Sequence, residues 1–318
     1  MSMARRSSPF ATLAVALLAV SAAARAGDSP PATPAPSTPL EAALAAKEWS
    51  RALPLAEEAA ETAGQAFAET LYRVARVRAF LGQRTEALDA LERAHAAGLF
   101  DVHTLRKDEA FAALRDDARF QALMKAIWLK GYLWILERKE RDTYQKPDEV
   151  MSALALKRGE RVADVGAGSG YFTLRLARAV SPAGGVLAVD ANADLLAHLD
   201  GRLKEAGLGN VRTLLVPKDD PRLPPGSLDT VLIVDTLHYV QDRAAWLKKV
   251  RSGLAPGGRV VVIDFVPKSV EERPWGPPPS QWMSREEVDA AMAEAGLVPR
   301  KVHGFLTEQF FVEYSAAP

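Results

Sequence analysis

The segment Arg161-Val-Ala-Asp-Val-Gly-Ala-Gly-Ser-Gly-Tyr-Phe172 decides the fold of the C-terminal half of the chain. Its first five residues predict a buried parallel strand, and residues 171–180 have the apolar spacing of a helix. The glycines between them, at 166, 168 and 170, allow positive φ angles and let a ligand approach the backbone closely. A strand, a glycine loop and a helix in this order form the crevice in which doubly wound sheets bind ligands.

Four further apolar segments predict the other parallel strands of this sheet, at residues 185–190, 211–216, 228–234 and 258–265. Helical segments alternate with these strands, which favours a doubly wound, Rossmann-like α/β sheet with helices on both faces. Residues 298–303 and 309–314 predict an antiparallel hairpin at the edge of the sheet. The sequence therefore predicts an α/β domain over residues 148–318.

An acidic residue ends the second predicted strand. Asp190 lies 20 residues beyond Gly170, and a carboxylate at this place can accept two hydrogen bonds from a ribose diol. The alternative role for Asp190 is that of a helix cap. A dinucleotide site would show the spacing Gly-x-Gly-x-x-Gly. In this loop the glycines alternate, and Asp164 lies two residues before the first of them.

At three places the sequence resembles the class I S-adenosylmethionine-dependent methyltransferases. Residues 162–172 resemble the first motif of that family, residues 223–232 the approach to its fourth strand, and residues 254–259 the turn before its fifth strand. The resemblance covers about residues 141–318. It implies an enzyme that uses S-adenosylmethionine as cofactor and methylates a small molecule or a protein side chain, an acceptor that the sequence does not identify.

The resemblance also implies roles for individual residues. The glycine loop would hold the amino-acid end of the cofactor, with Asp164 near its ammonium group, Asp190 at the ribose hydroxyls and Asp219 at the adenine amine. Tyr144 and Gln145 would fold over the cofactor from the N-terminal side. The implied cofactor-binding residues are Asp164, Gly166, Ala167, Gly168, Gly170, Tyr171, Asp190 and Asp219.

Methyl transfer needs a base only if the acceptor must lose a proton, because alignment of the reacting atoms supplies most of the rate. His238 follows the fourth predicted strand, where acceptors bind in this family, and it is the candidate base. Its alternative role is packing or orienting the acceptor, whereas His303 is expected to be structural. Residues 273–282 predict a rigid, proline-rich loop that lines the acceptor pocket. No metal site is predicted, and no carboxylate pair placed for acid–base work stands out.

Residues 40–127 are rich in Ala, Leu, Glu and Arg, with apolar residues at helical spacing. Residues 47–60 align with residues 82–95 at a period of 35, which resembles the 34-residue tetratricopeptide repeat. The segment 108–124 predicts a further helical pair whose inward residues are Phe111, Leu114, Phe120 and Leu123. Such a helical-repeat domain either binds a protein partner or packs as a cap on the next domain, and both alternatives stay open.

Residues 128–147 predict a connecting helix that ends before Pro147, because the residue before a proline disfavours helix. Asp148 is then expected to cap a helix over residues 149–156.

The N-terminus predicts export of the protein. Residues 1–26 combine Arg5 and Arg6, an apolar run and a final Ala-x-Ala, the three parts of a secretory signal peptide. A proline-rich linker follows at 27–39. The expected location is exported or periplasmic, with no membrane span after cleavage; the alternatives are a membrane anchor or a cytoplasmic protein. Export conflicts with a cofactor made in the cytoplasm, so the alternative function is an interaction protein with a non-catalytic methyltransferase-like fold.

Composition excludes several classes of protein. The 318 residues, of which 48% are hydrophobic, are typical of globular chains and leave room for two domains. Forty basic residues balance forty acidic ones, which argues against a nucleic-acid partner. The chain has no cysteine, which excludes disulfides, thiolate metal sites and a cysteine nucleophile.

Overall fold

The computed structural model describes residues 38–62, 67–99, 101–269 and 271–317. The predicted signal peptide lies outside the described residues, as does the predicted linker apart from Thr38 and Pro39. The described residues form two compact units, 38–135 and 136–317. In these ranges, no helix is both long and apolar enough to cross a membrane. Export therefore stays a prediction.

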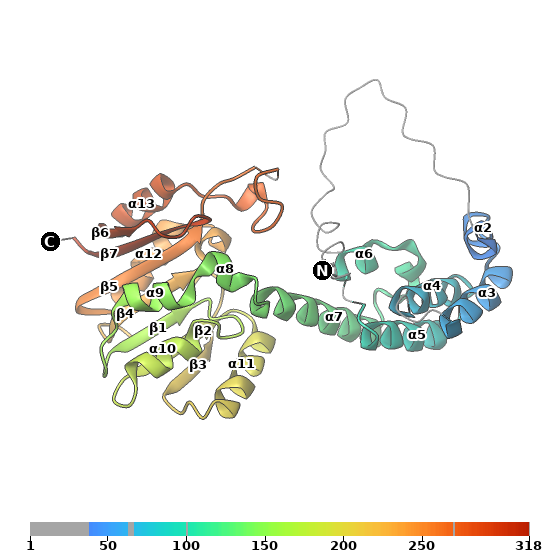
Figure 1. The fold of residues 1–318 in the computed structure, drawn as a ribbon, viewed down its shortest axis with the longest axis horizontal. Coiled ribbons are helices and arrows are strands. Elements are labelled where there is room, and N and C mark those ends of the chain that lie inside the picture. Colours follow the sequence, from blue (N-terminus) through green and yellow to red (C-terminus); the bar gives the residue numbers. More distant parts are fainter. Residues whose placement is uncertain (1–37, 63–66, 100, 270, 318) are drawn as a thin grey trace, which may run out of the picture. The chain divides into compact units, whose positions relative to one another are not determined.

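The N-terminal unit is all helical (Figure 1). Its elements are α2 (Pro39–Ala45), α3 (Trp49–Thr62), α4 (Phe67–Phe80), α5 (Arg84–Ala96), α6 (Val102–Lys107), the 3-10 helix η2 (Glu109–Leu114) and most of α7 (Ala118–Glu137). Helix α2 begins where the Thr38 side chain accepts a hydrogen bond from the Glu41 amide, with Pro39 in its first turn.

The core of this unit uses small residues where helices meet. Ala52 and Ala87, which align at the period of 35, both have side chains with no exposed surface. The four residues expected to face inward in the segment 108–124 are all buried, so that prediction is confirmed. The tetratricopeptide-like repeat itself stays a prediction.

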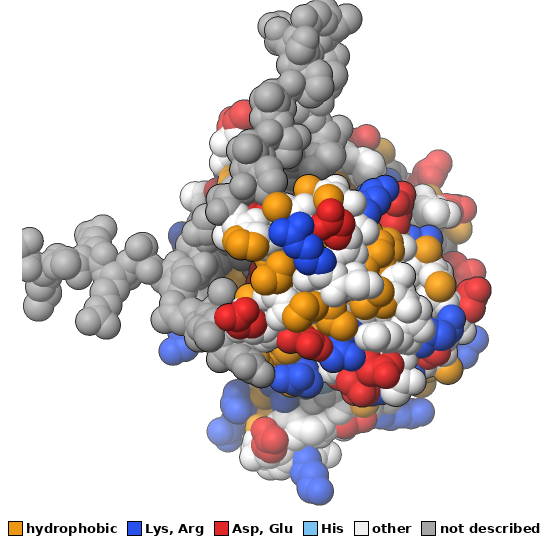
Figure 2. All heavy atoms as spheres, turned by 90° about the vertical axis from the view of Figure 1, so that its right-hand side faces the viewer, with side chains coloured by type: hydrophobic (Ala, Val, Ile, Leu, Met, Phe, Trp, Pro, Cys, Tyr) orange, Lys and Arg blue, Asp and Glu red, His pale blue; other side chains and the backbone are white. Residues whose placement is uncertain are grey.

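One face of the helical unit carries a groove beside two stacked aromatic rings. Trp49 of α3 and Phe80 of α4 stack with their centroids 4.0 Å apart, and both line the groove together with Arg76 and Asp108. Figure 2 shows hydrophobic side chains gathered on a face of the molecule among acidic and basic ones. Binding of a protein partner by these helices stays a prediction.

The C-terminal unit contains one seven-stranded sheet with the order β3-β2-β1-β4-β5-β7-β6 (Figure 1). The strands are β1 (Arg161–Val165), β2 (Gly185–Asp190), β3 (Val211–Leu215), β4 (Leu228–Val234), β5 (Leu254–Phe265), β6 (Leu297–His303) and β7 (Gln309–Ala316). The first five are parallel, and β7 pairs antiparallel with both β5 and β6. This order confirms the predicted doubly wound sheet with an edge hairpin.

Helices cover both faces of the sheet, which is why most residues of its central strands β1 and β4 are apolar and buried. The helices are α8 (Arg141–Gln145), α9 (Pro147–Leu154), α10 (Thr173–Val180), α11 (Ala193–Glu205), α12 (Arg243–Ser252) and α13 (Arg285–Glu294), with the 3-10 helices η3 (Leu237–Tyr239) and η4 (Pro279–Gln281). Along β4, Ile233 packs in the core that includes α12 and α13, whereas its neighbour Leu232 packs in the core that includes α9 and α10.

Two predicted boundaries are wrong. Asp148 does not cap a helix, because α9 begins at Pro147, and the residue before it, Lys146, is left-handed with φ 42°. Proline suits the first helical position since its φ is already helical and its missing N–H is not needed there. Strand β5 begins at Leu254, four residues before its predicted start, because Leu254 pairs with Leu228.

Candidate active site

The glycine loop between β1 and α10 has room for glycine alone at two of its positions. Gly166, Gly168 and Gly170 all have positive φ, of 79°, 56° and 87°. A Cβ on Gly166 would overlap Thr236, lying 2.7 Å from its Cγ2 and against its hydroxyl oxygen. A Cβ on Gly170 would overlap Leu199 and lie 2.8 Å from Leu174 Cδ1. The loop is therefore pressed against the turn that follows β4 and against α11.

Asp190, at the end of β2, holds this loop in place. Its Oδ2 accepts a 2.8 Å hydrogen bond from the Gly168 amide, and its Oδ1 accepts one of 2.8 Å from the Asn192 amide. Burial raises the pKa of Asp190 against the effect of these amides. Each carboxylate oxygen has two lone pairs, so both can accept a further hydrogen bond from a diol. The helix-cap alternative is wrong, since Asn192 caps α11 by accepting from the amides of Asp194 and Leu195.

Asp164 lies within β1 beneath the loop. It is 3% exposed, and its Oδ2 accepts a 2.6 Å hydrogen bond from the Thr173 hydroxyl at the start of α10. Burial raises the pKa of Asp164 to about 6, although Thr173 and the charge of Arg141 oppose that rise. A cation brought to this place would favour the ionised carboxylate.

Tyr171 connects the loop with α8. Its ring lies between two guanidinium groups, with Arg141 4.0 Å and Arg175 4.4 Å from the ring centroid, and its hydroxyl donates a hydrogen bond to Asp142. Ala167 is buried in the loop at 7% exposure. Asp219 lies apart from these groups, in the loop after β3, where its side chain is exposed and its carbonyl accepts from Lys249.

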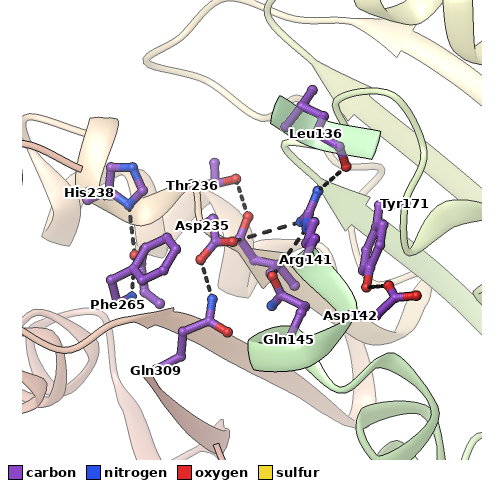
Figure 3. Close-up of polar contacts among 12 residues, drawn as sticks. Leu136, Arg141, Asp142, Gln145, Tyr171, Asp235, Thr236, His238, Phe265 and Gln309 are labelled. Carbon is purple, nitrogen blue, oxygen red and sulfur yellow. Dashed lines mark hydrogen bonds and ion pairs between the residues drawn. The ribbon is translucent and has the colours of Figure 1, made fainter. Parts of the chain in front are cut away.

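The candidate base lies at the carboxyl ends of β4 and β5. Nδ1 of His238, in η3, lies 2.7 Å from Asp264 Oδ1, and the Phe265 amide donates to the same oxygen at 2.9 Å (Figure 3). The side chains of His238 and Asp264 are 4% and 1% exposed. His303, by contrast, pairs with Glu313 on the edge hairpin and stacks on Phe311, in accord with the structural role expected for it.

A second carboxylate lies beside this pair. Asp235 directly follows β4 with φ 49°, accepts from Gln309 Nε2 at 2.5 Å and lies 3.8 Å from a guanidinium nitrogen of Arg141 (Figure 3). Burial, and then the charge of Asp264, raise the pKa of Asp235 to about 7, while Arg141 and His238 oppose the rise.

These contacts correct the expectation that no carboxylate pair stands out. Asp235 and Asp264 each end an apolar strand, Leu-Ile-Val-Asp and Val-Val-Ile-Asp, and parallel strands that are neighbours bring such ends to the same edge. That signal was present in the sequence. Arg141 and Gln309 carry no comparable signal, because the packing of α8 brings the first to this edge and the pairing of β7 with β5 brings the second.

Aromatic side chains form a wall at the same edge. The ring of Tyr144 lies 4.5 Å from that of Trp275 and 5.9 Å from that of Phe265, measured between centroids. Arg273, 4% exposed, lies over Phe265 at 4.8 Å. The predicted residues Tyr144 and Gln145 and the loop 273–282 thus meet at the ends of β4 and β5. We call Tyr144, Phe265 and Trp275 the aromatic wall.

The strand order reverses between β1 and β4, and the glycine loop lies at that point. This arrangement defines a Rossmann-like fold with a crevice that suits a nucleotide. Residues 163–260 match the Methyltransferase domain family. A SAM-dependent methyltransferase from Aquifex aeolicus has a similar structure, with a TM-score of 0.54 and 25% identity; the match covers 58% of this chain and 96% of that one.

Curated relatives match over a shorter stretch. The ubiquinone/menaquinone biosynthesis C-methyltransferase UbiE of Pasteurella multocida is 32% identical over 111 residues, 35% of this chain and 41% of that protein. The demethylmenaquinone methyltransferase of Geobacillus kaustophilus is 31% identical over 117 residues, 37% of this chain and 50% of that protein. The chain thus spans at most half the length of these two relatives. Its C-terminal unit contains a methyltransferase domain and has the fold of the S-adenosylmethionine-dependent methyltransferases, whose cofactor is S-adenosylmethionine.

The residues present fit this cofactor. The three glycines give the loop its positive φ angles without a side chain between its backbone and a ligand, and the buried Ser169 hydroxyl has no hydrogen-bond partner among the described residues. Asp190 keeps lone pairs for a diol, and Asp164 suits a cationic group. Bound there, S-adenosylmethionine supplies an electrophilic methyl group that needs no activation by the protein.

Proposed function

We propose that the chain methylates a small acceptor bound at the carboxyl ends of β4 and β5, beside the turn that bears His238. The observation that carries this proposal is the hydrogen bond from the Gly168 amide to Asp190. It joins the two parts of the proposed cofactor site, the loop and the ribose-binding carboxylate, in one rigid arrangement. The turn that bears His238 lies against the same loop through Thr236.

Calorimetric titration with S-adenosylmethionine tests this function. Asp190→Ala should weaken binding tenfold or more, which is about 1.4 kcal/mol. Asp200→Ala is the matched control, because Asp200 is an exposed carboxylate on α11 that accepts only from Thr213 among the described residues. Thermal unfolding would show that both variants are folded. Folded wild-type protein that does not bind the cofactor would contradict the proposal and favour the helical unit as the working part.

A finer proposal concerns the acceptor. The curated relatives are named as methyltransferases of ubiquinone and menaquinone biosynthesis, and the aromatic wall offers apolar surface to a planar ring. We propose a quinol-type aromatic acceptor on these two grounds. The test is transfer of a deuterated methyl group from labelled S-adenosylmethionine to a short-chain demethylmenaquinol, detected by mass spectrometry. Failure to detect labelled methyl on the demethylmenaquinol would contradict this proposal.

A further inference from the structure

His238 and Asp264 form a buried pair whose proton positions follow from a third group. The Phe265 amide can only donate, and it donates to the same Asp264 oxygen that contacts His238 Nδ1. Asp264 Oδ1 already accepts from this amide, and an ionised carboxylate oxygen can accept a second hydrogen bond but cannot donate one. Nδ1 therefore carries the proton of the neutral ring. Its other nitrogen, Nε2, has a lone pair and no hydrogen-bond partner among the described residues.

The turn that carries His238 packs against the loop that would hold the proposed methyl donor. His238 is two residues beyond Thr236, and Thr236 contacts Gly166 of the loop. Two carboxylates act on the ring, Asp264 on β5 and Asp235 on the same turn as His238, and Arg141 of α8 lies 3.8 Å from Asp235. The aromatic wall begins at Phe265, the residue next to Asp264.

Several buried polar atoms at this edge have no partner among the described residues. They are Asp264 Oδ2, Gln309 Oε1 and Gln145 Nε2. Buried polar atoms in folded proteins are rarely left without a hydrogen bond. Two of these atoms are acceptors and one is a donor, and they lie beside the aromatic wall. A ligand with hydroxyl groups on a flat apolar body could form hydrogen bonds with them and pack against the wall.

We propose that His238, oriented by Asp264, is the general base of the reaction and that the acceptor is a hydroxylated aromatic compound. This inference rests on the proposed function. The acceptor hydroxyl proton moves to Nε2, the oxygen or the ring carbon that it activates forms the bond to the methyl carbon, and the electron pair of the broken carbon–sulfur bond stays on sulfur. Where a ring carbon takes the methyl group, that carbon then loses its own hydrogen as a proton, which restores the aromatic ring, and the imidazolium returns its proton to the oxygen. Asp264, a positioning residue, stabilises the imidazolium that results.

Nitrogen NMR of histidine-labelled protein tests the role of Asp264 without any acceptor. The chain has five histidines, and the spectrum of His238→Gln assigns the signals of His238. We expect the wild-type ring at pH 8 to carry its proton on Nδ1, and Asp264→Ala to move population to the Nε2–H form. A wild-type ring protonated on Nε2 would overturn the proposal.

Turnover assays test the acceptor class. Catechol and 2-methylhydroquinone are the hydroxyl probes, and thioanisole is a ring of similar size without an ionisable proton. We expect labelled methyl on a hydroxyl probe, loss of about 100-fold or more in kcat for His238→Gln, and an unchanged Kd for S-adenosylmethionine. Asp264→Asn should lower kcat and leave KM within twofold, because the ring loses the carboxylate that orients it and stabilises the imidazolium.

His303→Gln is the matched control, because His303 also forms a buried pair with a carboxylate, Glu313, and lies on the edge hairpin. Its kcat should stay within twofold of wild type. Transfer to thioanisole alone, or to neither hydroxyl probe by enzyme that binds the cofactor, would overturn the acceptor class. Wild-type protein that fails to bind S-adenosylmethionine would instead contradict the proposed function, and the NMR measurement would still decide what Asp264 does.

Discussion

Thr236 lies against Gly166, so closely that a Cβ on the glycine would lie 2.8 Å from the threonine Cβ. Gly166 belongs to the loop after β1 and Thr236 to the turn after β4, the two neighbouring strands between which the strand order reverses. The proposed cofactor loop and the turn that carries Asp235 and His238 are therefore one packed unit, and a change in either should be felt by the other.

Gly166→Ala should lower both stability and cofactor affinity, because the new methyl group displaces the Thr236 turn. Gly207→Ala is the matched control: Gly207 also has a positive φ, of 65°, but a Cβ there meets nothing within 4 Å. The control measures the backbone strain alone, which is about 1 kcal/mol. We expect a clearly larger fall in Tm for Gly166→Ala and at least a tenfold higher Kd for S-adenosylmethionine. Equal effects of the two variants would show that the contact is unimportant.

Asp235→Asn should reduce the loss of stability between pH 5 and pH 8. The folded pKa of Asp235, about 7, lies above its unfolded value of 3.8, so the folded state holds the proton more tightly and stability falls as the pH rises between these values. Asparagine cannot ionise and tolerates the positive φ. We expect the change in Tm from pH 5 to pH 8 to shrink by roughly 5–10 °C, for about 2–3 kcal/mol.

Asp229→Asn supplies the control for that pH experiment. A hydrogen bond from Arg161 lowers the pKa of Asp229, so this carboxylate is ionised at both pH values. Its replacement should shift Tm by the same amount at pH 5 and pH 8. A pH dependence of Asp235→Asn equal to that of wild type would contradict the raised pKa.

Trp275→Ala should weaken binding of an aromatic acceptor, because it removes one of the three rings of the aromatic wall. Trp275→Phe keeps a ring beside Tyr144 and should restore most of the binding. The readouts are KM for a hydroxylated aromatic probe, expected to rise about tenfold in the alanine variant for a loss of roughly 1–1.5 kcal/mol, and the Kd for S-adenosylmethionine, expected to stay within twofold. A rise in that Kd with no change in KM would assign Trp275 to the cofactor.

Ala87→Leu should destabilise the helical unit. Ala87 of α5 has no exposed surface, and extra methylene groups in a packed core typically lower stability by about 1–3 kcal/mol. Ala96→Leu, on an exposed position of the same helix, is the control and should leave Tm within about 1 °C. Urea unfolding followed by circular dichroism measures both; equal midpoints would contradict the packing of α5.

The inner parallel strands could be predicted because helices bury both of their faces, and six of the seven residues of β4 are buried. Helix boundaries were harder. The proline at 147 indicates the end of one helix and the beginning of the next equally well, and the left-handed Lys146 that separates α8 from α9 has no signature in the sequence.

The candidate site divides in the same way. The glycine loop and Asp190 could be predicted, since their spacing along the chain is local to one strand–loop–helix unit. The contacts of His238 and Asp235 could not, because Asp264 reaches His238, and Gln309 reaches Asp235, only through the pairing of β5 with β4 and with β7. Arg141 and Asp235 form an ion pair although 94 residues separate them in the sequence. The side chain of Asp219, which the resemblance assigns to the adenine amine, is exposed.

A crystal structure of residues 136–318 or of the whole chain with S-adenosylhomocysteine tests the central claim most directly. We predict that the ribose hydroxyls bind the Asp190 carboxylate, that the homocysteine lies on the loop 166–170, and that the sulfur faces the turn bearing His238. Density for the ligand elsewhere in the molecule, or at Asp190 with its sulfur directed away from His238, would contradict the account.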